Sequence, residues 1–150
     1  LFRLFTALPK IRDMHFMLQL EVVNRLAAEP STSDYGRLSV MSQYYCDIEK
    51  LFEVPPTAFT PAPKVTSAIV RLTPKLHPSI ASDELLFGQI VTAAFGQRRK
   101  TIRNSLKPFA DSETLLEAGI DPKQRPENLS LQQFIDCANL LSNRSGSPAV

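Results

Sequence analysis

Residues 58–72 read Ala-Phe-Thr-Pro-Ala-Pro-Lys-Val-Thr-Ser-Ala-Ile-Val-Arg-Leu, a stiff loop that runs into a strand. Pro61 and Pro63 fix φ at alternate positions and withhold two backbone donors, so this part of the segment cannot pair into a sheet. Residues 65–72 are β-branched and apolar, which predicts a strand. The segment therefore predicts a strand that is entered through a rigid loop.

The loop also carries an aromatic ring and a cation. Phe59 precedes the two prolines and Lys64 follows them. A rigid loop that holds a ring and an ammonium group at a strand entrance is suited to gripping a planar, anionic ligand such as a nucleotide. The alternative is an edge-strand lead-in in which Phe59 simply packs in the core. The residues of the loop leave both interpretations open.

The residues before this segment predict the end of an α/β sheet. Strands are expected at residues 14–19, 48–54 and 65–72. Helices are expected at residues 1–8, 21–28 and 39–45. Three strands with helices between them fit the tail of such a sheet, and the last two strands are expected to be antiparallel neighbours.

A stiff linker is expected to divide the chain. Residues 74–78 read Pro-Lys-Leu-His-Pro, and the sequence behind them has helical patterns throughout. Ser82 is expected to cap the first of these helices, and further helices are expected at 111–119 and after Ser130. The predicted organisation is an α/β part at 1–74, a linker at 75–79 and a small all-helical domain at 80–150.

The composition is that of a globular protein and excludes several classes. Of the 150 residues, 43% are hydrophobic and 21% are charged, and the formal net charge is +2. No apolar stretch reaches the roughly 18 residues that a membrane-spanning helix needs. Cys46 and Cys137 are interpreted as two buried or idle thiols of a reducing compartment. Neither they nor His15 and His77 have metal-ligand spacing, so no metal site is expected.

The positive charge is concentrated in one segment. From Leu85 to Ala110 the chain has no Asp or Glu. The segment contains five basic residues: Arg98, Arg99, Lys100, Arg103 and Lys107. On one continuous helix at about 100° per residue, the last three share a face with Arg99 beside them, and the opposite side, with Ile102 and Leu106, seeks the core. Such a helix offers cations to a phosphate backbone. A solvated charged face is the alternative.

Three separated blocks resemble one known family. Residues 59–72 resemble the F-x-P-x-P-K-V-[DN]-S-A-V-V-R-L signature of the rRNA adenine dimethyltransferases. Residues 95–106 resemble the A-F-x-Q-R-R-K-T-[IL]-R-N-S-L block of its small-subunit (KsgA) branch, and residues 17–26 resemble the family's M-x-Q-K-E-V-x-x-R-L. Two positions depart from these patterns, because Thr66 stands where Asp or Asn is usual and Leu20 where Lys is usual.

The resemblance implies a fold, an activity and a set of contacts. The fold would be the tail of a Rossmann-like methyltransferase sheet followed by a small helical domain. The activity would be S-adenosylmethionine-dependent dimethylation of adenine N6 in 16S rRNA, in the cytoplasm, by a monomer that docks on the small ribosomal subunit. Phe59 would line the pocket of the target adenine, Pro61 and Pro63 would hold the ring, and Lys64 would reach a phosphate. The RNA-binding residues would be Arg98, Arg99, Lys100, Arg103 and Lys107.

The cofactor motifs of that family are missing from the sequence. The usual cradle for S-adenosylmethionine is a glycine-rich turn after the first strand, with an acidic residue at the end of the second. The five glycines of this chain never occur as G-x-G, and no Asn-Leu-Pro-Tyr motif is present. S-adenosylmethionine is therefore expected to be bound by a missing N-terminal half. The chain alone is expected to hold no catalytic, cofactor-binding or metal-binding residue.

Two other functions compete with this one. A non-enzymatic rRNA-binding or ribosome assembly factor would use only the basic helix and the helical domain, and the missing cofactor motifs favour it. The start of the chain argues against it, because residues 1–8 already read as the apolar face of a helix under way at Leu1. The chain is thus expected to be the rear portion of a longer protein. A DNA-binding transcription factor is the third option, and no helix-turn-helix spacing supports it.

Overall fold

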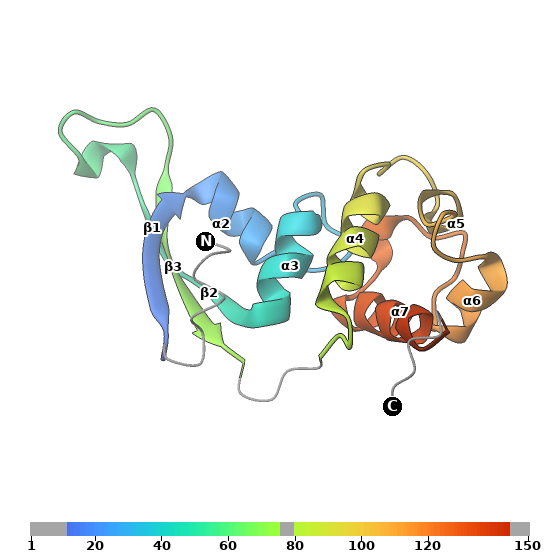
Figure 1. Cartoon of the computed structure of the whole chain (residues 1–150). Coiled ribbons are helices and arrows are strands. Elements are labelled where there is room, and N and C mark those ends of the chain that lie inside the picture. Colours follow the sequence, from blue (N-terminus) through green and yellow to red (C-terminus); the bar gives the residue numbers. More distant parts are fainter. Residues whose placement is uncertain (1–11, 76–79, 145–150) are drawn as a thin grey trace.

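The computed structural model describes residues 12–75 and 80–144. A sheet lies at one end of the molecule and a group of helices at the other, with α3 (Arg37–Tyr45) between them (Figure 1). The helix expected at 1–8 and most of the expected linker lie outside the described residues.

The described part of the chain forms one sheet of three strands, as the sequence predicts. They are β1 (Met14–Gln19), β2 (Cys46–Val54) and β3 (Ser67–Pro74). β3 lies in the middle and pairs antiparallel with both neighbours, in the order β1-β3-β2. The expected antiparallel pairing of the last two strands is therefore confirmed. The loop that joins them leaves the ladder where Val54 faces Ser67.

The sheet buries one face against α2 (Leu20–Leu26) and α3 (Figure 1). Val70 and Leu72, which point to this face, are fully buried in a cluster with Val23 of α2. Strand side chains alternate between the two faces, and none of the described helices packs on the opposite face. There the apolar side chains of Met17 and Phe52 remain 52% and 58% exposed.

Every regular element described between residues 80 and 144 is a helix. The α-helices are α4 (Glu84–Phe95), α5 (Ile102–Ser105), α6 (Ser112–Glu117) and α7 (Leu131–Arg144), and a 3₁₀ helix, η3, spans Pro126–Asn128. The cap expected at Ser82 is wrong by one residue. Asp83 caps α4, because its carboxylate accepts a hydrogen bond from the Leu86 N–H at 3.0 Å.

The helices share a core with residues that precede the expected linker. Phe87 of α4 and Phe134 of α7 are fully buried, and Tyr35 belongs to the same hydrophobic cluster. Tyr44 of α3 packs on Phe87 with ring centroids 4.7 Å apart. The boundary between this cluster and the cluster under the sheet therefore does not coincide with the expected linker. The division into two domains stays a prediction.

The continuous helix expected through the basic segment is wrong. α4 ends at Phe95, and the chain turns through residues 96–101 before the single turn of α5 begins. The glycine that follows α4 weakens a helix, and the Ile102 N–H donates to the Gln124 carbonyl at 2.6 Å instead of an acceptor in its own helix. Ile102 and Leu106 are fully buried, as the pattern predicts.

Candidate nucleic-acid interface

The loop between β2 and β3 carries the residues predicted to form a base pocket. It opens with a 3₁₀ turn, η2 (Pro56–Ala58), after which the Phe59 N–H donates to the Pro56 carbonyl at 3.2 Å. Phe59 is half-buried and belongs to neither hydrophobic cluster, which argues against a core role for its ring. The three residues predicted beside it are exposed: Pro61, Pro63 and Lys64. The loop projects beyond the end of the sheet (Figure 1).

The base of this loop is tied to α2 at the two positions that depart from the family pattern. The Leu20 N–H donates to the Thr66 carbonyl at 2.9 Å. The Leu20 side chain packs against the hydrophobic cluster under the sheet. A neutral, partly apolar pair therefore stands where the family pattern has Lys and Asp or Asn. The sequence shows two separate departures, and the fold makes them neighbours.

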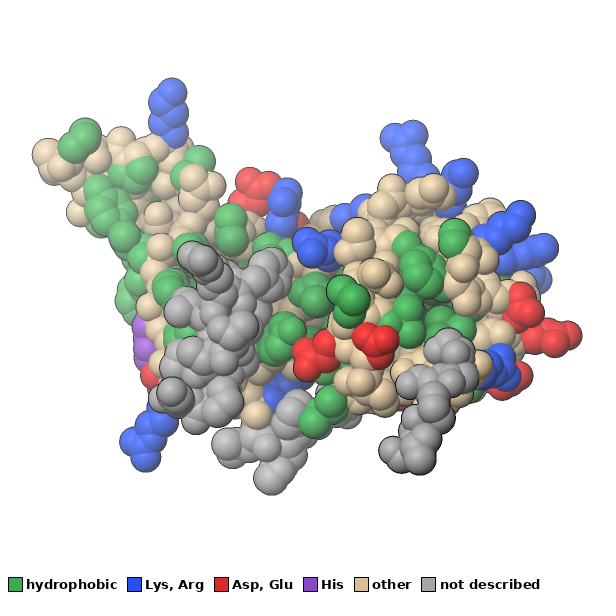
Figure 2. Space-filling model, viewed as in Figure 1, with side chains coloured by type: hydrophobic (Ala, Val, Ile, Leu, Met, Phe, Trp, Pro, Cys, Tyr) green, Lys and Arg blue, Asp and Glu red, His purple; other side chains and the backbone are tan. Residues whose placement is uncertain are grey.

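Four of the five predicted RNA-binding side chains are exposed cations without an ionic partner in the described part of the chain. They are Arg99, Lys100, Arg103 and Lys107. Figure 2 shows Lys and Arg side chains standing out from the helical end of the molecule. Unpaired, exposed cations suit a phosphate backbone, because binding releases the counterions of the nucleic acid without first breaking an ion pair in the protein.

Arg98 differs from its neighbours because its guanidinium is used within the molecule. Its Nη2 donates to the Tyr35 carbonyl at 2.8 Å, and the guanidinium carbon lies 5.9 Å from the centroid of the Phe95 ring. The first distance is that of a hydrogen bond, and the second is that of a cation–π interaction. Arg98 therefore fastens the loop before α3 to the end of α4.

The loop residue that Arg98 holds is itself an anchor. Tyr35 is 1% exposed, and its hydroxyl donates to the Leu129 carbonyl at 2.7 Å. Its ring meets Phe95 edge-on with centroids 5.9 Å apart. Burial raises the pKa of Tyr35 above its usual range, so the hydroxyl stays a neutral donor. Nothing in the sequence pattern indicated that Tyr35 joins the loop before α3 to α4 and to Leu129.

Two further cations were missed by the sequence analysis. The Arg103 N–H donates to the Pro122 carbonyl at 3.1 Å, so the loop before η3 lies against α5. This loop contributes Lys123 and Arg125, both exposed. The available signal was two bases between Pro122 and Pro126. Their nearness to the basic segment comes from the fold and cannot be read from sequence distance.

The fold does not bring the two predicted contact regions together. The loop that holds Phe59 extends from the sheet end, whereas α5 and α6 lie at the far side of the helical end (Figure 1). Two elements that lie at opposite ends of one view cannot be in contact. The chain thus presents a candidate base pocket and a separate candidate backbone contact.

The described residues do not fit a cradle for S-adenosylmethionine. Their glycines lie at the start of α3, inside α4, and after α4 and α6, and none follows a strand. No group of three or more His, Cys, Asp or Glu able to hold a metal ion occurs among the described residues. Cys46 and Cys137 are free and buried, and burial raises the pKa of each thiol to about 11. None of the described helices is both long and apolar enough to span a bilayer.

Comparison with known families decides where the chain belongs. The family model described as ribosomal RNA adenine dimethylase matches residues 1–143. The chain belongs to the ribosomal RNA adenine dimethylase family. The resemblance read from the three sequence blocks is therefore confirmed.

Curated relatives of the adenine dimethylase family match nearly all of the chain. It is 56% identical over 146 residues to ribosomal RNA small subunit methyltransferase A of Yersinia pestis (strain Pestoides F), covering 97% of this chain and 54% of the relative. The protein of the same name from Yersinia pseudotuberculosis serotype O:1b (strain IP 31758) matches to the same extent. The chain spans about half the length of the curated relatives it matches.

Solved structures show the same fold. A dimethyladenosine transferase from Plasmodium falciparum superposes with a TM-score of 0.77 over 91% of this chain and 59% of that protein, at 23% identity, which shows the fold alone. The 23S rRNA methyltransferase ErmE superposes with a TM-score of 0.63 over 89% of this chain and 56% of its own, at 26% identity. The α/β part of the prediction is therefore confirmed, whereas a separate all-helical domain stays a proposal.

Proposed function

We propose that this chain is the substrate-side part of an S-adenosylmethionine-dependent enzyme that dimethylates N6 of adenines in 16S rRNA during maturation of the small ribosomal subunit. The observation that carries the proposal is the half-buried Phe59 on a proline-stiffened loop, in a chain of the adenine dimethylase family. The enzyme acts as a cytoplasmic monomer, and its partner is the small subunit.

Phe59 receives the target adenine. A base must leave its stack before an enzyme reaches its exocyclic amine, and an aromatic face replaces part of the stacking that is lost. Such stacking contributes about 1–3 kcal/mol per base. Pro61 and Pro63 hold the ring where the base arrives, and Lys64 meets a neighbouring phosphate. Because the described residues contain no cofactor cradle, the methyl donor is bound outside them. The described chain itself positions the base and contributes no catalytic group.

The cations of the helical end hold the RNA. Arg99, Lys100, Arg103 and Lys107 neutralise backbone phosphates, which fixes the position of the RNA without reading its sequence. Arg98 contributes indirectly, because it keeps the helical end fastened to the loop before α3. A firm connection between the two ends matters when one end holds the backbone and the other receives the base.

The test is Phe59→Ala in the full-length protein, including any sequence beyond these 150 residues. We expect kcat/KM for methyl transfer to small ribosomal subunits to fall about 10- to 100-fold, since the stacking energy is lost. Phe52→Ala is the matched control, because this ring is 58% exposed on β2, outside the loop. Equal rates for Phe59→Ala and wild type would show that the ring does not receive the base.

A non-enzymatic rRNA-binding or assembly factor is the second candidate, and it would use only the exposed cations of the helical end. The two candidates predict different results for the wild-type protein. Incubation with small subunits and labelled S-adenosylmethionine transfers label only if the protein is an enzyme. Tight subunit binding without label transfer would support the assembly factor.

A further inference from the structure

A recess of about 410 Å³ lies between α5 and the start of α6. Its lining residues are Arg103, Asn104, Lys107, Ala110, Asp111 and Ser112. This volume is within the range of small-molecule binding pockets. The recess is remote from the loop of Phe59, which lies at the other end of the molecule (Figure 1).

Two uncommitted cations and an amide line the recess. Arg103 and Lys107 are exposed, and neither forms an ion pair or a side-chain hydrogen bond within the described chain. Asn104 lies between them in sequence and is likewise exposed, with its side-chain amide unbonded there. A guanidinium, an ammonium and an amide N–H are all donors to phosphate oxygens, and the guanidinium matches two of those oxygens at once.

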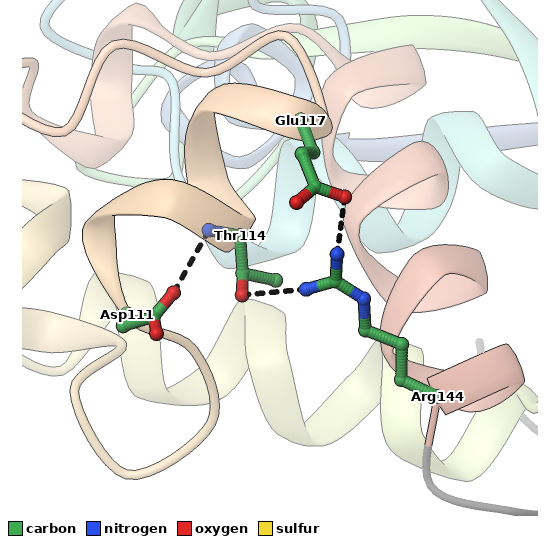
Figure 3. A network of polar contacts seen from close by, with 4 residues as sticks. All are labelled: Asp111, Thr114, Glu117 and Arg144. Carbon is green, nitrogen blue, oxygen red and sulfur yellow. Dashed lines mark hydrogen bonds and ion pairs between the residues drawn. The ribbon is translucent and has the colours of Figure 1, made fainter.

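Asp111 is the acidic residue in the lining, and its carboxylate is engaged elsewhere. It accepts a hydrogen bond from the Thr114 N–H at 2.8 Å (Figure 3). The hydrogen bonds from Thr114 lower the pKa of Asp111. Arg144 of α7 donates to the Thr114 hydroxyl at 2.8 Å and pairs with Glu117, so a cation stands behind the acid (Figure 3). Asp111 is thus engaged in capping α6, and the nearby Arg144 offsets part of its charge.

The backbone under the recess is held from several directions. The Ile102 and Arg103 N–H groups donate to carbonyls of the loop before η3, at 2.6 and 3.1 Å. Leu106 is fully buried, and Ala110 is 7% exposed. The Ser105 hydroxyl donates to the Thr101 carbonyl at 3.2 Å. Because this backbone is already fixed, binding a ligand here would have to order only the side chains of the donors.

We propose that this recess seats one backbone phosphate of the bound RNA, held by the Arg103 guanidinium, the Lys107 ammonium and the Asn104 amide. The proposal rests on the proposed function, since it takes RNA as the ligand. It distinguishes these residues from Arg99 and Lys100, which attract the RNA electrostatically but do not line the recess. It also adds Asn104, a neutral residue, as a contact that charge alone does not predict.

The test measures binding of a 16S rRNA transcript to the full-length protein over a range of salt concentrations. For the double variant Arg103→Gln/Lys107→Gln we expect affinity to fall at least about ten-fold, as when charged hydrogen bonds are lost. The slope of log K against log salt should flatten by about 0.7–0.9, because one backbone phosphate is no longer neutralised. For Asn104→Leu we expect weaker binding with an unchanged slope. Lys50→Gln, an exposed cation on β2, is the control and should change neither quantity.

Titration with inorganic phosphate, at constant ionic strength, tests whether the recess binds free phosphate instead of a phosphate of the RNA backbone. Loss of phosphate binding in the double variant with unchanged RNA affinity would overturn the RNA assignment. Unchanged affinity and slope in the double variant, or unchanged affinity in Asn104→Leu, would show that the recess does not bind an RNA phosphate. Failure of the wild type to bind the transcript overturns the proposed function as well, whereas wild-type binding with indifferent variants overturns the recess alone. Unchanged melting temperatures establish that the variants fold.

Discussion

The helical end and the sheet end of this molecule use their apolar residues in opposite ways. In the helical end, Phe87 and Phe134 are fully buried in a cluster that extends back through α3 to Tyr35. In the sheet end, one face packs on α2 and α3, whereas Met17 and Phe52 on the other face stay half exposed. The exposed cations are therefore carried by helices with a fully buried core. The loop that carries Phe59 is instead attached to a sheet on which the described helices cover one face only.

Two polar side chains fasten the loop before α3 to the helical end. Arg98 and Tyr35 join the end of α4 to the loop before α3, and the Tyr35 hydroxyl reaches Leu129 beyond η3. Three segments far apart in sequence therefore meet at two side chains. Variants at these positions test how much the contacts among these segments contribute to stability.

The largest effect is expected from Phe134→Ala. The ring is fully buried, and its centroid lies 5.7 Å from that of the Phe95 ring. Its removal leaves a cavity, so the free energy of unfolding should fall by about 3–5 kcal/mol. Urea unfolding followed by circular dichroism measures it. Phe52→Ala at the sheet end is the control and should cost less than about 1 kcal/mol. Equal costs for the two variants would break the comparison, because they would show that the open face is covered.

The next effect is expected from Tyr35→Phe, which removes only a hydroxyl. The buried Leu129 carbonyl then loses its donor, so the unfolding free energy should fall by about 1–2 kcal/mol. Thermal and urea unfolding both report it. Tyr45→Phe is a milder comparison, because its hydroxyl bonds the exposed Glu84. A loss at Tyr45 equal to that at Tyr35 would contradict the special role of the link to Leu129.

A smaller effect is expected from Arg98→Ala, about 1 kcal/mol of unfolding free energy from one charged hydrogen bond and one contact with Phe95 at an exposed site. Arg99→Ala should leave stability unchanged and flatten the salt dependence of RNA binding by about one counterion. The adjacent pair therefore separates a structural arginine from a binding one. If the two variants exchange these effects, the assignment is wrong.

The smallest effect concerns the base of the loop. In a cycle of Leu20→Lys, Thr66→Asp and the double variant, we expect a favourable coupling of about 0.5 kcal/mol, because the backbones of the two positions are hydrogen-bonded. Unfolding of all four proteins gives the coupling. Leu20→Lys alone should destabilise, since Leu20 packs on the sheet cluster. A coupling of zero would mean that the side chains do not meet.

Much of the sheet end was predictable from local pattern. The alternation of Met14–Gln19 and the apolar run before Pro74 mark strands wherever they lie in a fold. The basic segment was not predictable in the same way. Ile102 and Leu106 are spaced for a helix and are buried, yet residues 96–101 turn, because backbone donors find carbonyls in a loop some twenty residues further on. The spacing of apolar residues cannot show that a backbone N–H will bond a carbonyl of a distant loop instead of one in its own helix.

The sequence by itself determined the family, the three strands, the stiff loop of Phe59 and the concentration of cations, because all of these depend on residue type and short spacing. Only the tertiary structure decided which cations are free. It committed Arg98 to Tyr35, brought Lys123 near Arg103 and made neighbours of Leu20 and Thr66. The physical reason is that burial and hydrogen bonding depend on which surfaces meet, and residues far apart in the chain settle that.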